Sequence, residues 1–225
     1  MVEYKLLSYI LRADTPMYGG GSALRLEREK QIGNGDACNL TTINLPAHCG
    51  THVDAPRHFY DQGRHIAQYS IKELIFERPL VVECSKNPGQ FIMPEDLGDP
   101  HGCDLLLFRT GFGSCRGQDV YWQKNPGIAP ETAEVIRRDY PGIRAVGLDA
   151  ISVSSFADRS AGRRTHQLFL SDRGFASGPV LLIEDMDLRS SLNGLTRVFI
   201  APCLVEGAEG APCTVIGEFN KAGVA

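Results

Sequence analysis

The sequence has no surplus of basic residues. Its 23 Lys and Arg stand against 27 Asp and Glu, which gives a formal net charge of -4 and a pI near 5.9. This balance argues against nucleic acid or an anionic membrane as the main partner, because both require a basic surface. The chain also has no apolar run near the roughly 20 residues of a membrane span, and its first residues lack the apolar core of a signal peptide. We therefore expect a cytoplasmic protein that acts on a small molecule.

Paired cysteines are absent as well. The seven cysteines are widely and irregularly spaced, and no two of them form a Cys-x-x-Cys pair. This pattern argues against a disulfide framework and predicts free thiols in a reducing compartment. Cys49 lies among candidate metal ligands, but we expect it to be structural.

Length and hydrophobic patterning predict a single α/β domain over residues 1–225, because 43% of the residues are hydrophobic and no repeat or linker interrupts the chain. Buried-type strands at 104–109 and 143–149 flank a helix at 130–140, which is a βαβ-like unit in a chain otherwise rich in strands. The remaining predicted strands are 5–11, 23–27, 38–45, 79–84, 179–184, 197–205 and 213–219. The remaining predicted helices are a short one at 71–76, a helix start at 94–97 and a helix at 163–170.

Residues 48–58, His-Cys-Gly-Thr-His-Val-Asp-Ala-Pro-Arg-His, hold three of the six histidines. His48, His52 and Asp54 share one parity, so an extended strand would place all three side chains on one face. Gly50 leaves room between the two imidazoles. Pro56 removes a backbone donor and is expected to end the strand, which puts His58 on the following turn.

Imidazole and carboxylate groups that converge in this way favour a site for Zn(II), Mn(II) or Fe(II). A helix would also place His48 and His52 on one face, but Cys-Gly-Thr is poor helix material. The simpler alternative is a polar strand edge with satisfied histidines. Two His and an Asp on one face, with a third His nearby, favour a metal or catalytic site.

Other polar and aromatic residues carry weaker signals. Gly19-Gly20-Gly21 lacks the Lys and Ser/Thr of a phosphate-binding loop, so we expect a flexible loop. His65 is expected at the surface, and His101 receives no role. Aromatic residues are candidates either for a pocket that accepts a flat ring or for the core: Phe59, Tyr60, Phe112 and Trp122.

The central stretch resembles the signature of the metal-dependent cyclase family, which includes bacterial kynurenine formamidases and isatin hydrolases. That signature reads His-x-Gly-Thr-His-x-Asp-x-Pro-x-His-Phe, and the chain matches all eight fixed positions between residues 48 and 59. Supporting similarity extends over most of the chain, at 15–16, 108–111, 147–149 and 184–186. The resemblance implies a swivelling β/β/α domain, assembled as a homodimer or homotetramer.

The resemblance also implies roles for single residues. The metal ligands would be His48, His52 and Asp54, with His166 and Glu184 completing a second ion site, and His58 would transfer protons. Without the resemblance, His166 reads as an exposed helix histidine, and Glu184 faces either a site or solvent. Asp149, at the end of a strand, is either a supporting residue near the site or part of a plain turn.

Two departures from the formamidase pattern bear on the substrate. Residues 171–178 lengthen the connection between His166 and Glu184, and Asp185-Met186 stands where formamidases have Asn-Leu. Both features suggest a different subgroup of the same family, and 171–178 is the segment we expect to bear on substrate choice.

These observations together predict a hydrolase that cleaves an amide C–N bond with metal-activated water, first of all an arylformamidase. Opening of a cyclic amide or lactone is the alternative within hydrolases. A metal-dependent lyase or isomerase, and a metal-binding protein without catalysis, are the alternatives of other classes. His and carboxylate ligands serve both Zn(II) and Mn(II), so the sequence does not distinguish between these metals. It also does not say whether one or two ions are bound.

Overall fold

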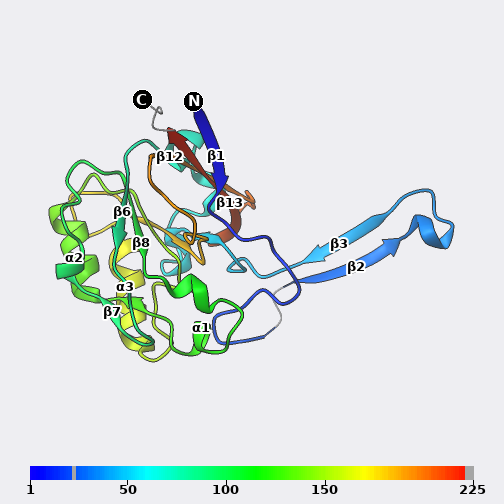
Figure 1. The fold of residues 1–225 in the computed structure, drawn as a ribbon, viewed down its shortest axis with the longest axis horizontal. Coiled ribbons are helices and arrows are strands. Elements are labelled where there is room, and N and C mark those ends of the chain that lie inside the picture. Colours follow the sequence, from blue (N-terminus) through cyan, green and yellow to red (C-terminus); the bar gives the residue numbers. More distant parts are fainter. Residues whose placement is uncertain (22–23, 221–225) are drawn as a thin grey trace.

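One mixed sheet of nine strands organises the molecule (Figure 1). The computed structural model describes residues 1–21 and 24–220. Four neighbouring strands of the sheet run parallel: β6 (Pro79–Glu83), β8 (Leu105–Arg109), β10 (Ala145–Leu148) and β11 (Leu181–Glu184). The antiparallel half comprises β4 (His52–Asp54), β13 (Gly210–Asn220), β12 (Leu195–Pro202) and β5 (Ile75–Phe76), with β1 (Val2–Leu6) beside β13. The strand β4 is the seam, because it pairs with β11 on one side and β13 on the other.

Each face of the parallel half buries its own core. Leu106 and Phe108 of β8 pack on the side that also holds Ile136 of α2 (Pro130–Asp139) and Phe169 of α3 (Arg159–Leu170). Leu105 and Leu107 point the other way, into the core formed with β4, β12 and β13. Because both faces of these strands are covered, their sequences are continuous hydrophobic runs and do not alternate between apolar and polar residues.

The predicted fold class is confirmed. The strands β8 and β10 are parallel neighbours with α2 between them in the chain, which is the βαβ unit expected at 104–149. The helix predicted at 163–170 begins four residues earlier, because Asp158 caps it by accepting a hydrogen bond from the Ala161 amide (3.0 Å). A third, short helix, α1 (Val120–Gln123), was not predicted.

Several predicted boundaries were wrong. The first strand ends at Leu6 rather than Leu11, and the helix expected at 71–76 is a 3-10 turn, Ile71–Leu74, that leads into β5. The helix start at 94–97 is likewise a 3-10 turn, Pro94–Asp96. Segments of four to six residues are too short for hydrophobic periodicity to separate a helix from a turn and strand. The other short elements are β7 (Phe91–Ile92), β9 (Gly127–Ile128) and the 3-10 turns Ile32–Asn34, Pro56–His58, Ile66–Gln68 and Phe112–Cys115.

The strands β2 (Arg25–Lys30) and β3 (Leu40–Asn44) form a hairpin, here called the arm, that projects from the body (Figure 1). It accounts for the predicted strand at 38–45 and for most of that at 23–27, of which Ala23 lies outside the described residues. Leu26 pairs with Ile43, so both side chains lie on one face, where they are 54% and 60% exposed. The arm therefore presents an apolar face that its own chain leaves uncovered.

The segment 171–178 follows α3 directly and is held by Arg137 of α2. The guanidinium of Arg137 is buried there and donates to the carbonyl oxygens of Leu168, Phe169, Ser171 and Ser177 at 2.6–3.2 Å. It thereby satisfies the carbonyl groups at the C-terminal end of α3 and ties down both ends of the segment.

Among the described residues, no helix has the length and apolar character needed to cross a bilayer.

Gly147 tests how tightly the parallel half is packed. A Cβ added there would lie 2.5 Å from Met186 Sδ and 2.8 Å from Leu107 Cδ2, whereas one added at Gly142 would lie 3.5 Å from its nearest neighbour, the Cys103 carbonyl oxygen. We expect Gly147→Ala to lower the free energy of unfolding by about 1–3 kcal/mol because of overpacking. Urea denaturation would measure this change, with Gly142→Ala as the matched control. Equal stability of the two variants would contradict the packing argument.

Candidate metal centre

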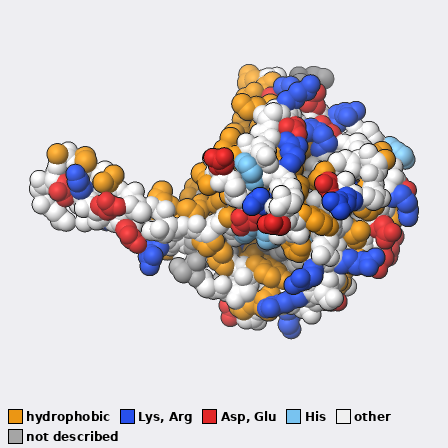
Figure 2. Space-filling model, turned by 180° about the vertical axis from the view of Figure 1, so that it is seen from behind, with side chains coloured by type: hydrophobic (Ala, Val, Ile, Leu, Met, Phe, Trp, Pro, Cys, Tyr) orange, Lys and Arg blue, Asp and Glu red, His pale blue; other side chains and the backbone are white. Residues whose placement is uncertain are grey.

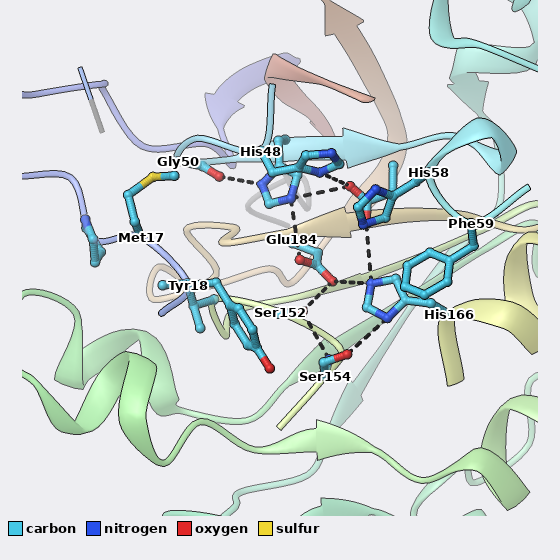
Figure 3. Close-up of a pocket in the computed structure, with 14 residues that line it drawn as sticks. Met17, Tyr18, His48, Gly50, His58, Phe59, Ser152, Ser154, His166 and Glu184 are labelled. Atoms are coloured by element: carbon cyan, nitrogen blue, oxygen red, sulfur yellow. Dashed lines mark hydrogen bonds and ion pairs between the residues drawn. The ribbon is translucent and has the colours of Figure 1, made fainter. Parts of the chain in front are cut away.

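Four histidines and two carboxylates line a pocket at the seam between β4 and β11 (Figure 3). In the antiparallel register of these strands, His52 lies opposite Glu184 and Asp54 lies opposite Leu182. The cavity has a volume of about 300 Å³, near the lower end of the range for small-molecule sites. It is lined by Pro16, Met17, Tyr18, His48, Gly50, His52, Asp54, His58, Phe59, Ile151, Ser152, Ser154, His166 and Glu184.

The predicted strand over residues 48–54 was wrong for its first half. Only His52–Asp54 is extended, and His48 lies on a turn, because Gly50 adopts a left-handed conformation (φ +62°). A Cβ at Gly50 would lie 2.4 Å from Leu11 Cδ2. His48 reaches Asp54 from outside the strand, and Gly210 leaves room for its ring, since a Cβ there would lie 2.9 Å from His48 Cε1.

Asp54 lies between three imidazoles. Its Oδ1 is 2.8 Å from His48 Nδ1 and 3.4 Å from His52 Nε2, and its Oδ2 is 3.4 Å from His166 Nε2. The side chain is 1% exposed, and Oδ2 has no hydrogen-bond partner among the described residues. One carboxylate thus faces two separate groups of nitrogen atoms.

Glu184 faces the same imidazoles from β11. Its Oε2 is 3.4 Å from His52 Nε2, and its Oε1 is 3.5 Å from His166 Nε2. The carboxylate is oriented by the Ser152 hydroxyl and the Val153 amide, which donate to Oε1 at 2.9 and 2.7 Å.

The far nitrogens of the two buried imidazoles are fixed by backbone carbonyls. His52 Nδ1 donates to the Gly50 carbonyl oxygen (2.8 Å), and His166 Nδ1 donates to that of Gly162 (3.0 Å). The Ser154 hydroxyl is also 3.0 Å from His166 Nδ1. These contacts turn both Nε2 atoms toward the carboxylates. Metal-ligating histidines are oriented in the same way, by an acceptor that binds the ring N–H on the side away from the metal.

The charges of the cluster are strongly coupled. Burial disfavours imidazolium, but Glu184 and Asp54 outweigh it and raise the pKa of His52 to about 9 and that of His166 to about 10. Burial likewise opposes the ionised carboxylates, but the imidazoles hold the pKa of Asp54 and of Glu184 below their usual values. Positive charge at the Nε2 positions therefore stabilises this cluster, and protons and a divalent cation compete to supply it.

The donor set fits a divalent metal ion. Ligand atoms of His48, His52 and Asp54 lie within 4.8 Å of one another, and so do those of Asp54, His58 and His166. The unpartnered Oδ2 of Asp54 is the kind of buried acceptor that a cation satisfies. Nitrogen and carboxylate ligands suit Zn(II) and Mn(II).

His58 lies at the edge of this cluster, at the end of the 3-10 turn Pro56–His58. Its ring packs against that of His48, with 4.2 Å between centroids, and edge-on against Phe59. Burial lowers the pKa of His58. The ring is therefore neutral at pH 7 and able to accept a proton.

The remaining predicted positions lie outside the pocket lining. His65 is half-buried near the surface, and His101 packs against Tyr140. Cys49 is fully buried beside the cluster. The carboxylate of Asp149 accepts from the Thr110 and Gly111 amides (2.8 and 2.9 Å), so it shapes the next loop rather than the ligands.

Of the four candidate aromatic residues, only Phe59 lines the pocket. Phe112 is buried against Tyr121, Trp122 packs against Phe156, and the Tyr60 hydroxyl donates to the Gln167 carbonyl oxygen.

Several residues of the site were missed from sequence, among them Ser152 and Ser154, which contact Glu184 and His166. Glu209 accepts from His48 Nε2 (3.2 Å), and Tyr18 forms a wall of the pocket opposite the histidines (Figure 3). Glu209 is 161 residues from His48 in a turn without periodicity, so no local pattern identifies it. Tyr18 was missed because the glycine run that follows it predicted only a flexible loop.

Metal binding should release protons. Because His52 and His166 have pKa values of about 9 and about 10, both are protonated at pH 7, and each must lose a proton to become a ligand. We expect about two protons released on loading with Zn(II) at pH 7, and an affinity that rises between pH 7 and 9. Calorimetric titrations in buffers of different ionisation enthalpy would count the protons. A binding enthalpy independent of the buffer would contradict the assignment of these two ligands.

Comparison with known proteins identifies the family of the chain. A family model described as putative cyclase matches residues 6–155. A kynurenine formamidase of Erythrobacter litoralis is 30% identical over 219 residues, which cover 96% of this chain and 94% of the relative. Among solved structures, isatin hydrolase A from Labrenzia aggregata superposes with a TM-score of 0.80 at 20% identity, over 98% of this chain and 94% of the other. A potential metal-dependent hydrolase with cyclase activity superposes with a TM-score of 0.75 at 22% identity, over 99% and 100%. The seam pocket, the signature at 48–59 and the shared fold agree with the family match, and the chain belongs to the cyclase family.

Proposed function

We propose that this protein is a metal-dependent hydrolase that cleaves the amide C–N bond of an aryl formamide. The proposal rests on the arrangement of four buried side chains in the pocket. The Nε2 atoms of His52 and His166 face the carboxylates of Asp54 and Glu184. One oxygen of Asp54, Oδ2, has no hydrogen-bond partner among the described residues. Zn(II) or Mn(II) would be held by these four residues with His48. When bound, such an ion supplies a Lewis acid that polarises a carbonyl group and acidifies water.

Other residues of the pocket would transfer protons and contact the substrate. His58, neutral at pH 7, takes a proton from the attacking water and returns it to the departing nitrogen, because its ring borders the ligand cluster without belonging to its most buried part. Phe59 and Tyr18 form apolar walls for a flat ring. The Ser154 hydroxyl lines the same cavity and offers a polar contact to the substrate.

The choice of an aryl formamide is supported by the kynurenine formamidase relative, which this chain matches over nearly its whole length. Opening of a cyclic amide or lactone is the second candidate, because isatin hydrolase shares the fold. Assays of N-formylkynurenine beside isatin would separate the two. Turnover of either without incorporation of oxygen from labelled water would refute hydrolysis and favour a lyase or isomerase.

His58→Ala tests the proton-transfer role. We expect the metal content of the purified variant to match that of the wild type, and kcat on N-formylkynurenine to fall by roughly 100-fold or more, the scale of lost acid–base catalysis. Elemental analysis and steady-state kinetics would be measured on one preparation, with His101→Ala as control, because His101 lies outside the pocket lining. Loss of metal in His58→Ala would make His58 a ligand, and an unchanged kcat would remove it from the mechanism.

We further propose that the arm packs against a second copy of the chain. Its apolar pair, Leu26 and Ile43, lies on a hairpin that extends away from its own body (Figure 1). Its other face is polar and internally bonded, with Glu27 accepting from Asn44 (3.3 Å) and paired to Arg25 (3.2 Å).

The body carries a matching apolar surface. In β1 the side chains of Val2, Tyr4 and Leu6 are 49%, 62% and 56% exposed, and hydrophobic side chains gather along the edge of the body above the base of the arm (Figure 2). A two-fold pair in which each arm covers the partner's β1 would bury both surfaces, since an isologous interface uses the same patches twice.

Light scattering on Leu26→Asp/Ile43→Asp tests this assembly. These side chains are more than half exposed, so we expect the variant to keep its fold and become a monomer where the wild type is a dimer or larger. The double variant Glu27→Lys/Asn44→Lys, on the polar face of the same arm, is the matched control. A wild type that is monomeric at high micromolar concentration would refute the proposal.

A further inference from the structure

The residue that follows Glu184 has an unusual backbone. Asp185 is the only non-glycine among the described residues with a positive φ, +52°. This left-handed conformation is strained for most side chains, and Asp and Asn tolerate it best. The strain lies at the C-terminal end of β11, one residue beyond a carboxylate of the candidate metal centre.

A buried ion pair holds the Asp185 side chain. Arg116 donates to both carboxylate oxygens, from Nε at 2.9 Å to Oδ1 and from Nη2 at 2.7 Å to Oδ2. The Tyr121 hydroxyl donates to Oδ1 at 2.5 Å, and neither Tyr121 nor Asp185 is more than 1% exposed. The bidentate fork fixes the direction of the carboxylate as well as its charge.

The backbone of Asp185 joins the two halves of the centre. Its amide donates to the Ala150 carbonyl oxygen (2.8 Å), and its carbonyl oxygen accepts from the Thr51 hydroxyl (2.5 Å). Thr51 lies between His48 and His52 in the chain. The conformation of this one residue therefore sets both the end of β11, which carries Glu184, and the loop that leads into β4.

We propose that Asp185, held by Arg116 and Tyr121, is a positioning residue that sets the distance between the Glu184 carboxylate and the imidazoles of β4 and α3. The inference rests on the proposed metal centre, but not on which substrate it serves. The simpler alternative is that the buried pair only stabilises the fold. A buried pair is a poor device for stability alone, because desolvation offsets much of its attraction.

Asp185→Asn isolates the ion pair, because Asn keeps the tolerance for the left-handed backbone. We expect its affinity for Co(II), measured by chelator competition, to fall about 10- to 100-fold, the scale seen when residues that orient metal ligands are changed. We also expect the visible absorption of bound Co(II), which reports its coordination, to change. Tyr121→Phe should shift both readouts in the same direction by less. Asp187→Asn is the matched control, since it breaks the neighbouring and more exposed pair with Arg189 (2.8 Å) and should alter neither readout.

A double variant separates positioning from stability. Arg116→Met/Asp185→Asn leaves no unpaired buried charge, so its stability should recover relative to Asp185→Asn, whereas its Co(II) affinity should stay low. If this double variant regained Co(II) affinity as well as stability, the contacts of Asp185 with Arg116 and Tyr121 would have only a structural role. That result would overturn the inference. Wild-type affinity and spectrum in Asp185→Asn would also overturn it. If Asp185→Asn does not fold, Tyr121→Phe and the double variant decide by the same two readouts.

The outcome is independent of the proposed reaction. A wild type that binds Co(II) but hydrolyses neither N-formylkynurenine nor isatin would refute the proposed substrates. The positioning role would stand if the Co(II) readouts of Asp185→Asn still differed from those of the wild type.

Discussion

The buried carboxylate of Asp54 is the constraint to which the surrounding structure responds. A carboxylate that is 1% exposed must be compensated by positive charge or hydrogen bonds, and three imidazoles converge on it from a turn, a strand and a helix. Gly210 leaves room for the His48 ring, which a Cβ there would meet, and the left-handed φ of Gly50 turns the chain between His48 and β4. The seam strand β4 places this charge where the two halves of the sheet meet, within reach of groups from both.

Sequence alone predicted the elements whose signals are local. The α/β class, the βαβ unit at 104–149 and the helix at 130–140 follow from long apolar runs and from Pro130 at a helix start, whereas the swivelling β/β/α fold was expected from the family resemblance. The parity of His48, His52 and Asp54 suggested one shared strand face, yet only His52 and Asp54 lie on a strand. His48 joins them because of the turn at Gly50, whose left-handed φ a parity argument does not include.

Local sequence patterns could not identify site residues that lie far apart in the chain. His166 and Glu184 were named only through the family resemblance, and the structure brings both to Asp54 and His52. Glu209 and Arg116 were not named at all, because their contacts with His48 and Asp185 span 161 and 69 residues. The Asp185-Met186 departure from the formamidase pattern was noted from the sequence, but the sequence shows neither the positive φ of Asp185 nor the guanidinium of Arg116 that holds it.

The buried guanidinium of Arg137 connects the segment 171–178 to the helix that carries His166. It satisfies the carbonyl groups at the end of α3 and anchors Ser171 and Ser177, so the chain between these residues begins and ends at fixed points. His166 lies on the preceding turn of the same helix, so the anchored carbonyl groups and this imidazole belong to one rigid element. None of residues 171–178 lines the seam pocket, whose walls include Tyr18 and Phe59. Any influence of this segment on substrate choice, as expected from the sequence, would therefore reach the pocket through α3 and not by direct contact.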